Sequence, residues 1–214
     1  MDLKAFYKLS YGLYIVSSNL DGKQCGCIVN TVTQVTAEPV QLAVTVNKDN
    51  YTKKAIENSG YFTAVALTQS ADMNLIGTFG FKCSADVDKF EGLQTATDEQ
   101  GIAYVTQNAA ARFSCKVLQQ IDLGTHVMFI GEALAAEILS DEEVMTYAYY
   151  QTVKKGGTPK SAPSYKGESA QPEAPVKKGF CCSICGYILE ADTLPADYVC
   201  PICGKSAEFF TPLN

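Results

Sequence analysis

Two Cys-x-x-Cys motifs near the end of the chain constrain its fold and chemistry more than any other feature. They are Cys182-Ser-Ile-Cys185 and Cys200-Pro-Ile-Cys203, with fourteen residues between them. Four thiolates in two such hooks can close a tetrahedron around one metal ion, which suits zinc or iron. A single motif would leave a redox dithiol open, whereas the second pair favours a four-cysteine metal site. Cys181 adjoins Cys182 without this spacing and is expected to be a bystander.

Residues that flank the hooks favour iron over zinc. Gly186 and Gly204 each follow a hook, and glycine lets backbone N–H groups turn toward the sulfurs without a Cβ clash. Such hydrogen bonds tune the potential of an iron–sulfur site. Together with the run 194–199 before the second hook, this segment resembles a rubredoxin, which implies a mononuclear iron that carries one electron at a time. A structural zinc knuckle is the alternative. The aromatic residues expected to pack beneath the site are Tyr187, Tyr198 and Phe209.

The chain of 214 residues has room for one full-size domain and one small one. We expect a large domain over 1–155, a Pro- and Lys-rich linker over 156–177, and a small metal-binding domain over 178–214. A unit as small as the last one seldom folds by apolar burial alone, so metal binding and folding are expected to be coupled there. The linker region holds four of the eight prolines and shows no apolar periodicity.

The charge pattern argues against a nucleic-acid partner. The net charge is −6, and both predicted domains are acidic while the linker region is basic. An acidic electron carrier would be drawn to a basic docking face on its partner. No signal peptide is recognisable at the start, and no apolar run approaches ~20 residues, so no membrane association is expected. Nine cysteines, an odd number, argue against a secreted disulfide framework and favour a reducing cytoplasm.

The large domain reads as mainly β with a few helices. Seven or so strands suggest an antiparallel barrel, and EALAAE in the last strand is kept as strand although propensity favours helix. The predicted strands are 11–18, 23–32, 39–46, 61–67, 102–106, 113–121 and 126–138. The predicted helices are 2–10, one from residue 50 or 51 to Gly60, a helical turn within 72–81, and one that a capping box at Ser140 opens.

Several blocks of the large domain resemble the flavin reductase-like, FMN-binding split-barrel family. The resemblance covers nearly all of 1–155 and implies an FMN-binding split barrel that forms a homodimer, with the flavin near the subunit interface. The matching blocks are Tyr11–Val16, Asn30–Thr36 with Pro39, Asn47–Thr52, Asn74–Lys82, Lys89–Gly92 and Gly124–His126. Composition alone would also allow these polar residues to be ordinary strand-end and turn residues.

The resemblance assigns flavin-binding roles by position. The flavin ring would lie against residues 28–31 and Gln34, and Lys48 and Thr52 would favour the phosphate. His126 is either a general acid for the flavin or a packed residue, and Cys27 either a thiol near the flavin or a small buried hydrophobe like Cys25, Cys83 and Cys115. The cofactor-binding candidates are Ile28, Val29, Asn30, Thr31, Gln34, Asn47, Lys48, Asn50, Thr52, Lys82 and His126.

Taken whole, the chain resembles the high-molecular-weight rubredoxins of anaerobes. That family implies electron transfer between FMN and a four-cysteine iron, with an NAD(P)H-dependent rubredoxin reductase as donor and a flavodiiron O2 or NO reductase as acceptor. One alternative is an NAD(P)H:flavin reductase with a rubredoxin or zinc appendage, and another is a flavin-free binding module with structural zinc. No G-x-G-x-x-G motif is present, although split-barrel reductases can bind nicotinamide without it.

Overall fold

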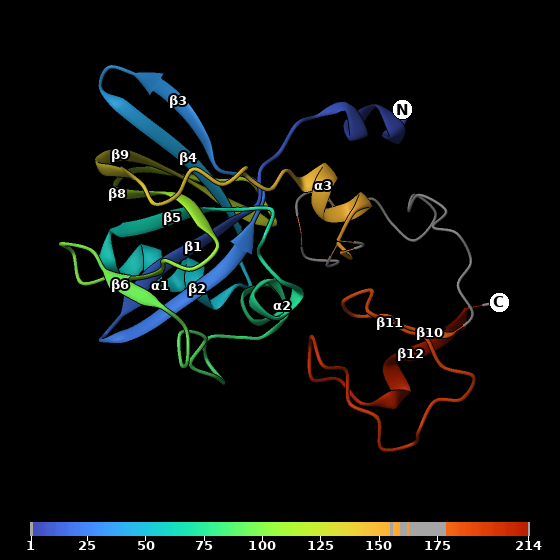
Figure 1. The fold of residues 1–214 in the computed structure, drawn as a ribbon. Coiled ribbons are helices and arrows are strands. Elements are labelled where there is room, and N and C mark those ends of the chain that lie inside the picture. Colours follow the sequence, from blue (N-terminus) through green and yellow to red (C-terminus); the bar gives the residue numbers. More distant parts are fainter. Residues whose placement is uncertain (1, 155, 159–161, 163–178, 214) are drawn as a thin grey trace.

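The computed structural model describes residues 2–154, 156–158, 162 and 179–213. Its main feature is a seven-stranded antiparallel sheet with the strand order β2-β1-β5-β8-β9-β4-β3 (Figure 1). The strands of this sheet are β1 (Tyr14–Leu20), β2 (Lys23–Val29), β3 (Thr33–Ala37), β4 (Val40–Asn47), β5 (Tyr61–Leu67), β8 (Ala109–Asp122) and β9 (His126–Ile138). A short 3-10 helix, η1 (Leu3–Lys8), precedes them.

The large sheet curls around one apolar core, as expected for a split barrel. Val16, Val44, Phe62 and Phe129 come from four different strands, and all are fully buried in this core. Helix α1 (Tyr51–Ser59) adds Ile56 to it. Asn50 caps the start of α1, and Gly60 ends it in the left-handed conformation with φ 75°. The expected mainly β architecture with a few helices is confirmed.

A second core lies between the sheet and two further helices, α2 (Met73–Phe81) and α3 (Tyr147–Thr152). The sequence predicted only a helical turn within 72–81, because Gly77 and Gly80 look like helix breakers. That prediction was wrong. The carboxylate of Asp72 accepts a hydrogen bond from Leu75 N at 2.8 Å, and the apolar side chains of the helix are buried, so capping and packing outweigh the glycine cost of ~1 kcal/mol per residue.

Two other local predictions were wrong. The return strand ends at Val29 rather than at residue 32, and the chain then forms β3, which was not predicted. Ser140 does not cap a helix, because α3 begins only after its cap residue Thr146. The backbone of Met145 instead pairs with Leu67 and Leu13, and these hydrogen bonds are incompatible with an earlier helix.

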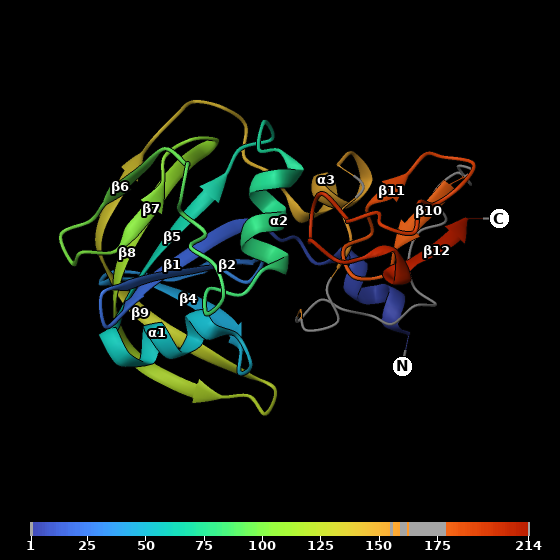
Figure 2. The same cartoon turned by 90° about the horizontal axis from the view of Figure 1, so that it is seen from below.

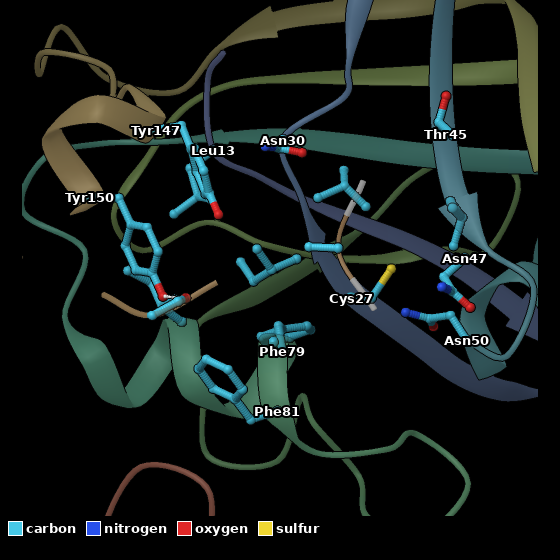
Figure 3. A pocket seen from close by; sticks show the side chains of 17 residues that line it. Leu13, Cys27, Asn30, Thr45, Asn47, Asn50, Phe79, Phe81, Tyr147 and Tyr150 are labelled. Atoms are coloured by element: carbon cyan, nitrogen blue, oxygen red, sulfur yellow. Dashed lines mark hydrogen bonds between the residues drawn. The ribbon is translucent and has the colours of Figure 1, made fainter. Parts of the chain in front are cut away.

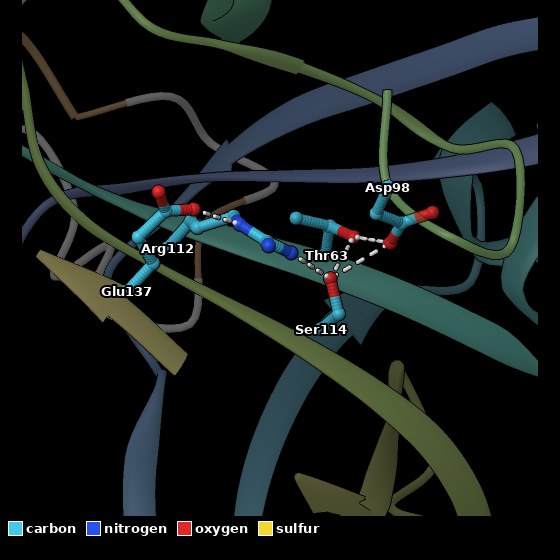
Figure 4. Close-up of polar contacts among 5 residues, drawn as sticks. All are labelled: Thr63, Asp98, Arg112, Ser114 and Glu137. Atoms are coloured by element: carbon cyan, nitrogen blue, oxygen red, sulfur yellow. Dashed lines mark hydrogen bonds and ion pairs between the residues drawn. The ribbon is translucent and has the colours of Figure 1, made fainter. Parts of the chain in front are cut away.

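A polar network that the sequence did not reveal anchors the hairpin of β6 (Thr95–Thr97) and β7 (Ala103–Val105) to the large sheet (Figure 4). The carboxylate of Asp98 accepts hydrogen bonds from the hydroxyls of Thr63 and Ser114 at 2.6 and 2.8 Å. It also accepts bonds from two backbone N–H groups of its own turn. Arg112 then donates to Ser114 and pairs with Glu137.

The C-terminal segment forms a separate three-stranded sheet of order β11-β10-β12. Its elements are β10 (Gly179–Cys182), β11 (Ile188–Leu189), η3 (Ala207–Phe209) and β12 (Phe210–Leu213). The rings of Tyr187 and Tyr198 pack edge-on against Phe210. The expectation that Phe209 joins them was wrong by one residue. Of the predicted linker, only residues 156–158 and 162 lie among the described residues.

Helix α2 stands between the barrel and the C-terminal sheet (Figures 1 and 2). Met73 and Phe81 of this helix pack against the apolar cluster that contains the four hook cysteines. In the part of the chain that the structure describes, no helix is long and apolar enough to cross a membrane.

Candidate metal centre and flavin pocket

The four cysteines predicted to bind metal come together at one point. Their sulfurs all lie within 4.8 Å of one another, and all four residues are buried. The Sγ atoms of Cys182 and Cys203 are 3.6 Å apart, and those of Cys185 and Cys200 are 3.5 Å apart. A tetrahedron with metal–sulfur bonds of 2.3 Å has sulfur–sulfur edges of about 3.8 Å. The thiols are therefore already arranged for one tetrahedral ion, and Cys181 lies outside this group.

Both hooks present backbone N–H groups to the sulfurs. The N–H of Tyr187 donates to the sulfur of Cys185, and the N–H of Lys205 donates to the sulfur of Cys203. Gly186 and Gly204, at φ 76° and 72°, turn the chain so that these groups face inward. The glycine after each hook therefore has the role that the sequence suggested, and the donors are of the kind that tune iron–sulfur potentials.

The thiols of the cluster differ in acidity. Burial raises the pKa of Cys203 to about 11, although the N–H of Lys205 opposes this. Burial would also raise the pKa of Cys182, but the N–H groups of Cys185 and Ile184 stabilise its thiolate and lower the pKa below its ordinary value. A thiolate at Cys182 is the species that an incoming cation binds.

The barrel contains an open pocket, with about 690 Å³ of empty space when the solvent in its mouth is included. Strands β2 and β4, helices α2 and α3, and the segment around Gly157 form its walls (Figure 3). The lining residues are Leu13, Cys27, Ile28, Val29, Asn30, Thr45, Val46, Asn47, Asn50, Ile76, Phe79, Gly80, Phe81, Tyr147, Tyr150, Gly157 and Ala162.

One end of the pocket is polar. Asn47 and Asn50 lie there at the start of α1, with Thr45 close by (Figure 3). The side chain of Asn50 accepts from Thr52 N at 3.0 Å, and that of Asn47 accepts from Asp49 N at 2.8 Å. These bonds hold the carbonyl ends of both amides. Amide groups beside a helix N-terminus suit a polyhydroxyl chain or a phosphate.

The other end of the pocket is aromatic. The rings of Tyr147 and Tyr150 stack with their centroids 5.7 Å apart, and both residues are buried. The hydroxyl of Tyr150 donates to Gly157 O at 2.9 Å, and the hydroxyls of Tyr147 and Thr158 share a bond of 2.6 Å. Burial raises the pKa of Tyr150 well above its ordinary value, so this hydroxyl stays neutral. These tyrosines were not predicted to line a pocket.

The structure brings some of the predicted flavin-binding residues to the pocket and leaves others outside it. Those in its lining are Ile28, Val29, Asn30, Asn47 and Asn50. Those outside it are Thr31, Gln34, Lys48, Thr52, Lys82 and His126. The assignment of all eleven to the flavin stays a prediction.

Thr31, Lys48 and His126, which lie outside the pocket, make contacts elsewhere. Thr31 Oγ1 donates to Thr45 O at 2.8 Å and so lies just behind the lining. Lys48 Nζ pairs with Asp122 at 2.7 Å, and Gln34 and Lys82 are exposed. His126 lies opposite Asn47 on the neighbouring strand, where its Nδ1 bonds Thr125 Oγ1 at 2.8 Å.

A buried lysine stands behind the pocket wall and was not among the candidates. Lys89 is only 3% exposed, and its ammonium donates to Gly26 O at 2.8 Å and to Phe79 O at 3.1 Å. Burial lowers its pKa. The lysine ties β2 to the end of α2 and so fixes two walls of the pocket. Burial also raises the pKa of Cys27, which favours the interpretation of this thiol as a small hydrophobe.

Comparison with known proteins agrees with this arrangement of two sites. Residues 6–158 match the model of the flavin reductase like domain, and residues 180–211 match that of the rubrerythrin, rubredoxin-like domain. The chain belongs to the flavin reductase-like domain family. Within that family it carries a C-terminal rubredoxin-like domain, as the high-molecular-weight rubredoxins do.

Two curated relatives cover most of the chain. A high molecular weight rubredoxin of Moorella thermoacetica is 37% identical over 98% of this chain and 99% of its own length. A ferric-chelate reductase (NAD(P)H) of Archaeoglobus fulgidus is 49% identical over 77% of this chain and 98% of its own length. A flavoredoxin structure from Methanosarcina acetivorans, 24% identical with a TM-score of 0.56, covers 60% of this chain and 69% of that one and shows the shared fold.

The cofactors of these families fit the residues present. The four sulfurs have the spacing and the N–H donors of a mononuclear iron site. The pocket combines an aromatic end with an amide-lined end, as a flavin with its ribityl phosphate requires. Flavin and iron are therefore the cofactors that this chain is built to hold.

Proposed function

We propose that the chain passes electrons between an FMN in the barrel pocket and a mononuclear iron held by its four hook cysteines. Flavin exchanges two electrons and iron one, so the two together connect two-electron donors with one-electron partners. The observation that carries this proposal is the position of α2. Phe81 of this helix lines the pocket and also packs against the cysteine cluster, so one side chain contacts both sites.

The chain's own residues would bind and orient the flavin. Ile28 and Val29 would lie against the ring, while Asn30, Asn47 and Asn50 would hold the ribityl chain. The positive end of the α1 dipole, where Thr52 lies, would attract the phosphate, and Lys48 would add positive charge nearby. Tyr147 and Tyr150 would exclude water from the aromatic end, which strengthens every polar contact inside. In this proposal the flavin-binding domain spans 1–155, the linker 156–177 and the iron-binding domain 178–214.

Redox partners follow from the same reasoning. We infer that an NAD(P)H-dependent rubredoxin reductase supplies electrons and that a flavodiiron-type O2 or NO reductase accepts them. The iron-binding region from 179 onward is acidic, so a basic docking face on each partner would match it. None of the nine cysteines, all of which lie among the described residues, is in a disulfide, which is consistent with a reducing cytoplasm.

A homodimer is also part of the proposal. Strand β3 is exposed along its whole length, and Val35 and Val40 beside it are each 44% exposed. Unpaired edge strands with apolar side chains are normally covered in proteins. A second copy would cover this edge, and sedimentation of the FMN-loaded chain should give twice the mass of 23.1 kDa. A monomer at micromolar concentration would contradict it.

Direct reduction by NAD(P)H is the second candidate function. The 49% identity to a relative described as a ferric-chelate reductase (NAD(P)H) favours it, because 165 residues of this chain match 98% of that relative's length. Rapid anaerobic mixing of the loaded chain with NADH alone separates the two functions. Flavin bleaching that requires added rubredoxin reductase supports electron transfer between proteins. Fast bleaching without a partner supports the reductase.

A further inference from the structure

The two hooks share their backbone design, but their isoleucines differ sharply in exposure. Each places isoleucine before its second cysteine, at Ile184 and Ile202. In each hook the N–H after that cysteine donates to the carbonyl of the first, at 2.8 Å for Gly186 and 2.9 Å for Gly204. Ile184 is nevertheless 38% exposed, whereas Ile202 is 7% exposed. Since the hooks are so similar, the difference comes from what covers the second one.

Helix α2 covers the second hook at Gly77. A Cβ atom at this position would lie 2.5 Å from Ile202 Cγ2 and 2.9 Å from its carbonyl oxygen. Real Cβ atoms do not approach other atoms so closely, so any other residue here would push the hook away. Glycine within a helix costs ~1 kcal/mol relative to alanine. The three heavy atoms nearest to that absent Cβ all belong to Ile202, so the close approach that requires glycine here is to the hook.

The side chains next to Gly77 complete the contact surface. Met73, one turn before it, and Phe81, one turn after it, both pack against the cluster of Ile202 and the hook cysteines. The opposite face of the helix carries Ile76 and Phe79, which line the pocket. The second hook and the pocket therefore lie on two faces of the same turn of helix.

We propose that the groove at Gly77 is the docking site for the hook 200–203 of the same chain, and that docking there is the step that lets iron and flavin exchange electrons. This inference rests on the proposed function. With both groups bound, ferric iron would take one electron from the reduced flavin, and a one-electron acceptor protein would then reoxidise the ferrous iron. A second such cycle would remove the second electron, and the protons of the reduced flavin would go to solvent. The first hook keeps Ile184 open to solvent throughout.

Gly77→Ala tests the docking site. Alanine is the better helix former, so the barrel should retain its fold and its flavin. We expect the equilibrium constant between the docked and the undocked hook to fall at least about tenfold, equivalent to about 1.4 kcal/mol. Small-angle scattering of the zinc-loaded chain should show a larger radius of gyration than the parent. Anaerobic stopped-flow of the iron-loaded chain should show a slower exchange between flavin and iron by a similar factor.

A pair of hook variants supplies the matched control. Ile202→Ala should expand the particle and slow the exchange, and Ile184→Ala, at the equivalent position of the first hook, should do neither. Ile202→Ala also removes the Cγ2 atom that lies closest to Gly77. The double variant Gly77→Ala/Ile202→Ala should therefore lose less docking free energy than the sum of the losses in the two single variants.

Each result decides the matter. If Gly77→Ala matches the parent in scattering, or expands the particle without slowing the exchange, the inference is wrong. If Ile184→Ala has the same effect as Ile202→Ala, the choice of hook is wrong. If the parent chain is compact and Gly77→Ala expands it, yet no electrons pass between flavin and iron in either, the proposed function fails while the docking site stands.

Discussion

Replacing Lys89 by methionine should destabilise the barrel and change how its stability depends on pH. Methionine keeps the apolar stem but removes the charge and two hydrogen bonds, of 2.8 Å to Gly26 O and 3.1 Å to Phe79 O. Hydrogen bonds from a charged group contribute about 1.5–3 kcal/mol each, so the gross loss is about 3–6 kcal/mol. The lowered pKa of Lys89 shows that burying its charged form is unfavourable. Removing that charge therefore offsets part of the loss in stability. We expect a net loss of about 2–4 kcal/mol.

The pH dependence follows from the direction of that shift. Since the folded pKa lies below the ordinary value of 10.5, the unfolded chain binds a proton in this window that the folded chain has released. Stability contributed by this site therefore rises as pH increases from the lowered pKa to about 10.5, and it is lowest at neutral pH. The methionine variant lacks this rise, so its deficit relative to the parent should widen with pH.

Urea unfolding of the barrel between pH 7 and pH 10.5 measures both effects. Lys53→Met is the control, since Lys53 pairs with Glu57 one turn along the same helix and the loss of such an i,i+4 pair should cost about 0.5 kcal/mol or less. If the Lys89→Met and parent curves differ by less than the Lys53→Met change, or stay parallel over the whole pH range, the role assigned to Lys89 is wrong.

Three further substitutions test the two sites and their support. Cys200→Ser should abolish metal retention and the hydrogen-exchange protection of 179–213 while flavin stays bound, whereas Cys181→Ser should keep the metal. Tyr150→Phe removes the bond to Gly157 O and should weaken flavin binding about fivefold by titration calorimetry, with Tyr149→Phe unchanged. Asp98→Ala removes four acceptor contacts and should lower the free energy of unfolding by about 2–4 kcal/mol.

Each of these has an outcome that would refute it. Metal binding by Cys200→Ser would show that three thiols suffice, and loss of flavin in that variant would show that the barrel depends on the tail. Equal flavin affinity in Tyr150→Phe and the parent would remove the tyrosine from the site. An Asp98→Ala variant with the same free energy of unfolding as the parent would show that the network in Figure 4 does not stabilise the barrel.

The sequence predicted the parts whose signal is local. The hook cysteines could be found because the Cys-x-x-Cys spacing is itself typical of metal ligands. Helix α1 could be found because Asn50 and Gly60 mark its ends. The EALAAE segment is strand, as expected, because it pairs with β8 and so overrides its helix propensity.

Contacts between distant segments could not be predicted. Tyr147 and Tyr150 enter the pocket because the backbone around Tyr147 bonds to Tyr11 and Leu13 at the start of the barrel, and nothing near the two tyrosines in the sequence shows this. Gly77 and Gly80 look like helix breakers until the packing of their helix is known. Lys89 reads as a surface lysine, and only the carbonyls of Gly26 and Phe79 explain its burial.

Reductive titration under strictly anaerobic conditions tests the central claim most directly. The chain, produced with ample iron and saturated with FMN, should take up about three electrons, two at the flavin and one at the iron. The absorption of the ferric site should be lost on uptake of one of the three electrons. Uptake of about two electrons, with zinc found at the four cysteines or with iron that never changes its redox state, would contradict an electron relay.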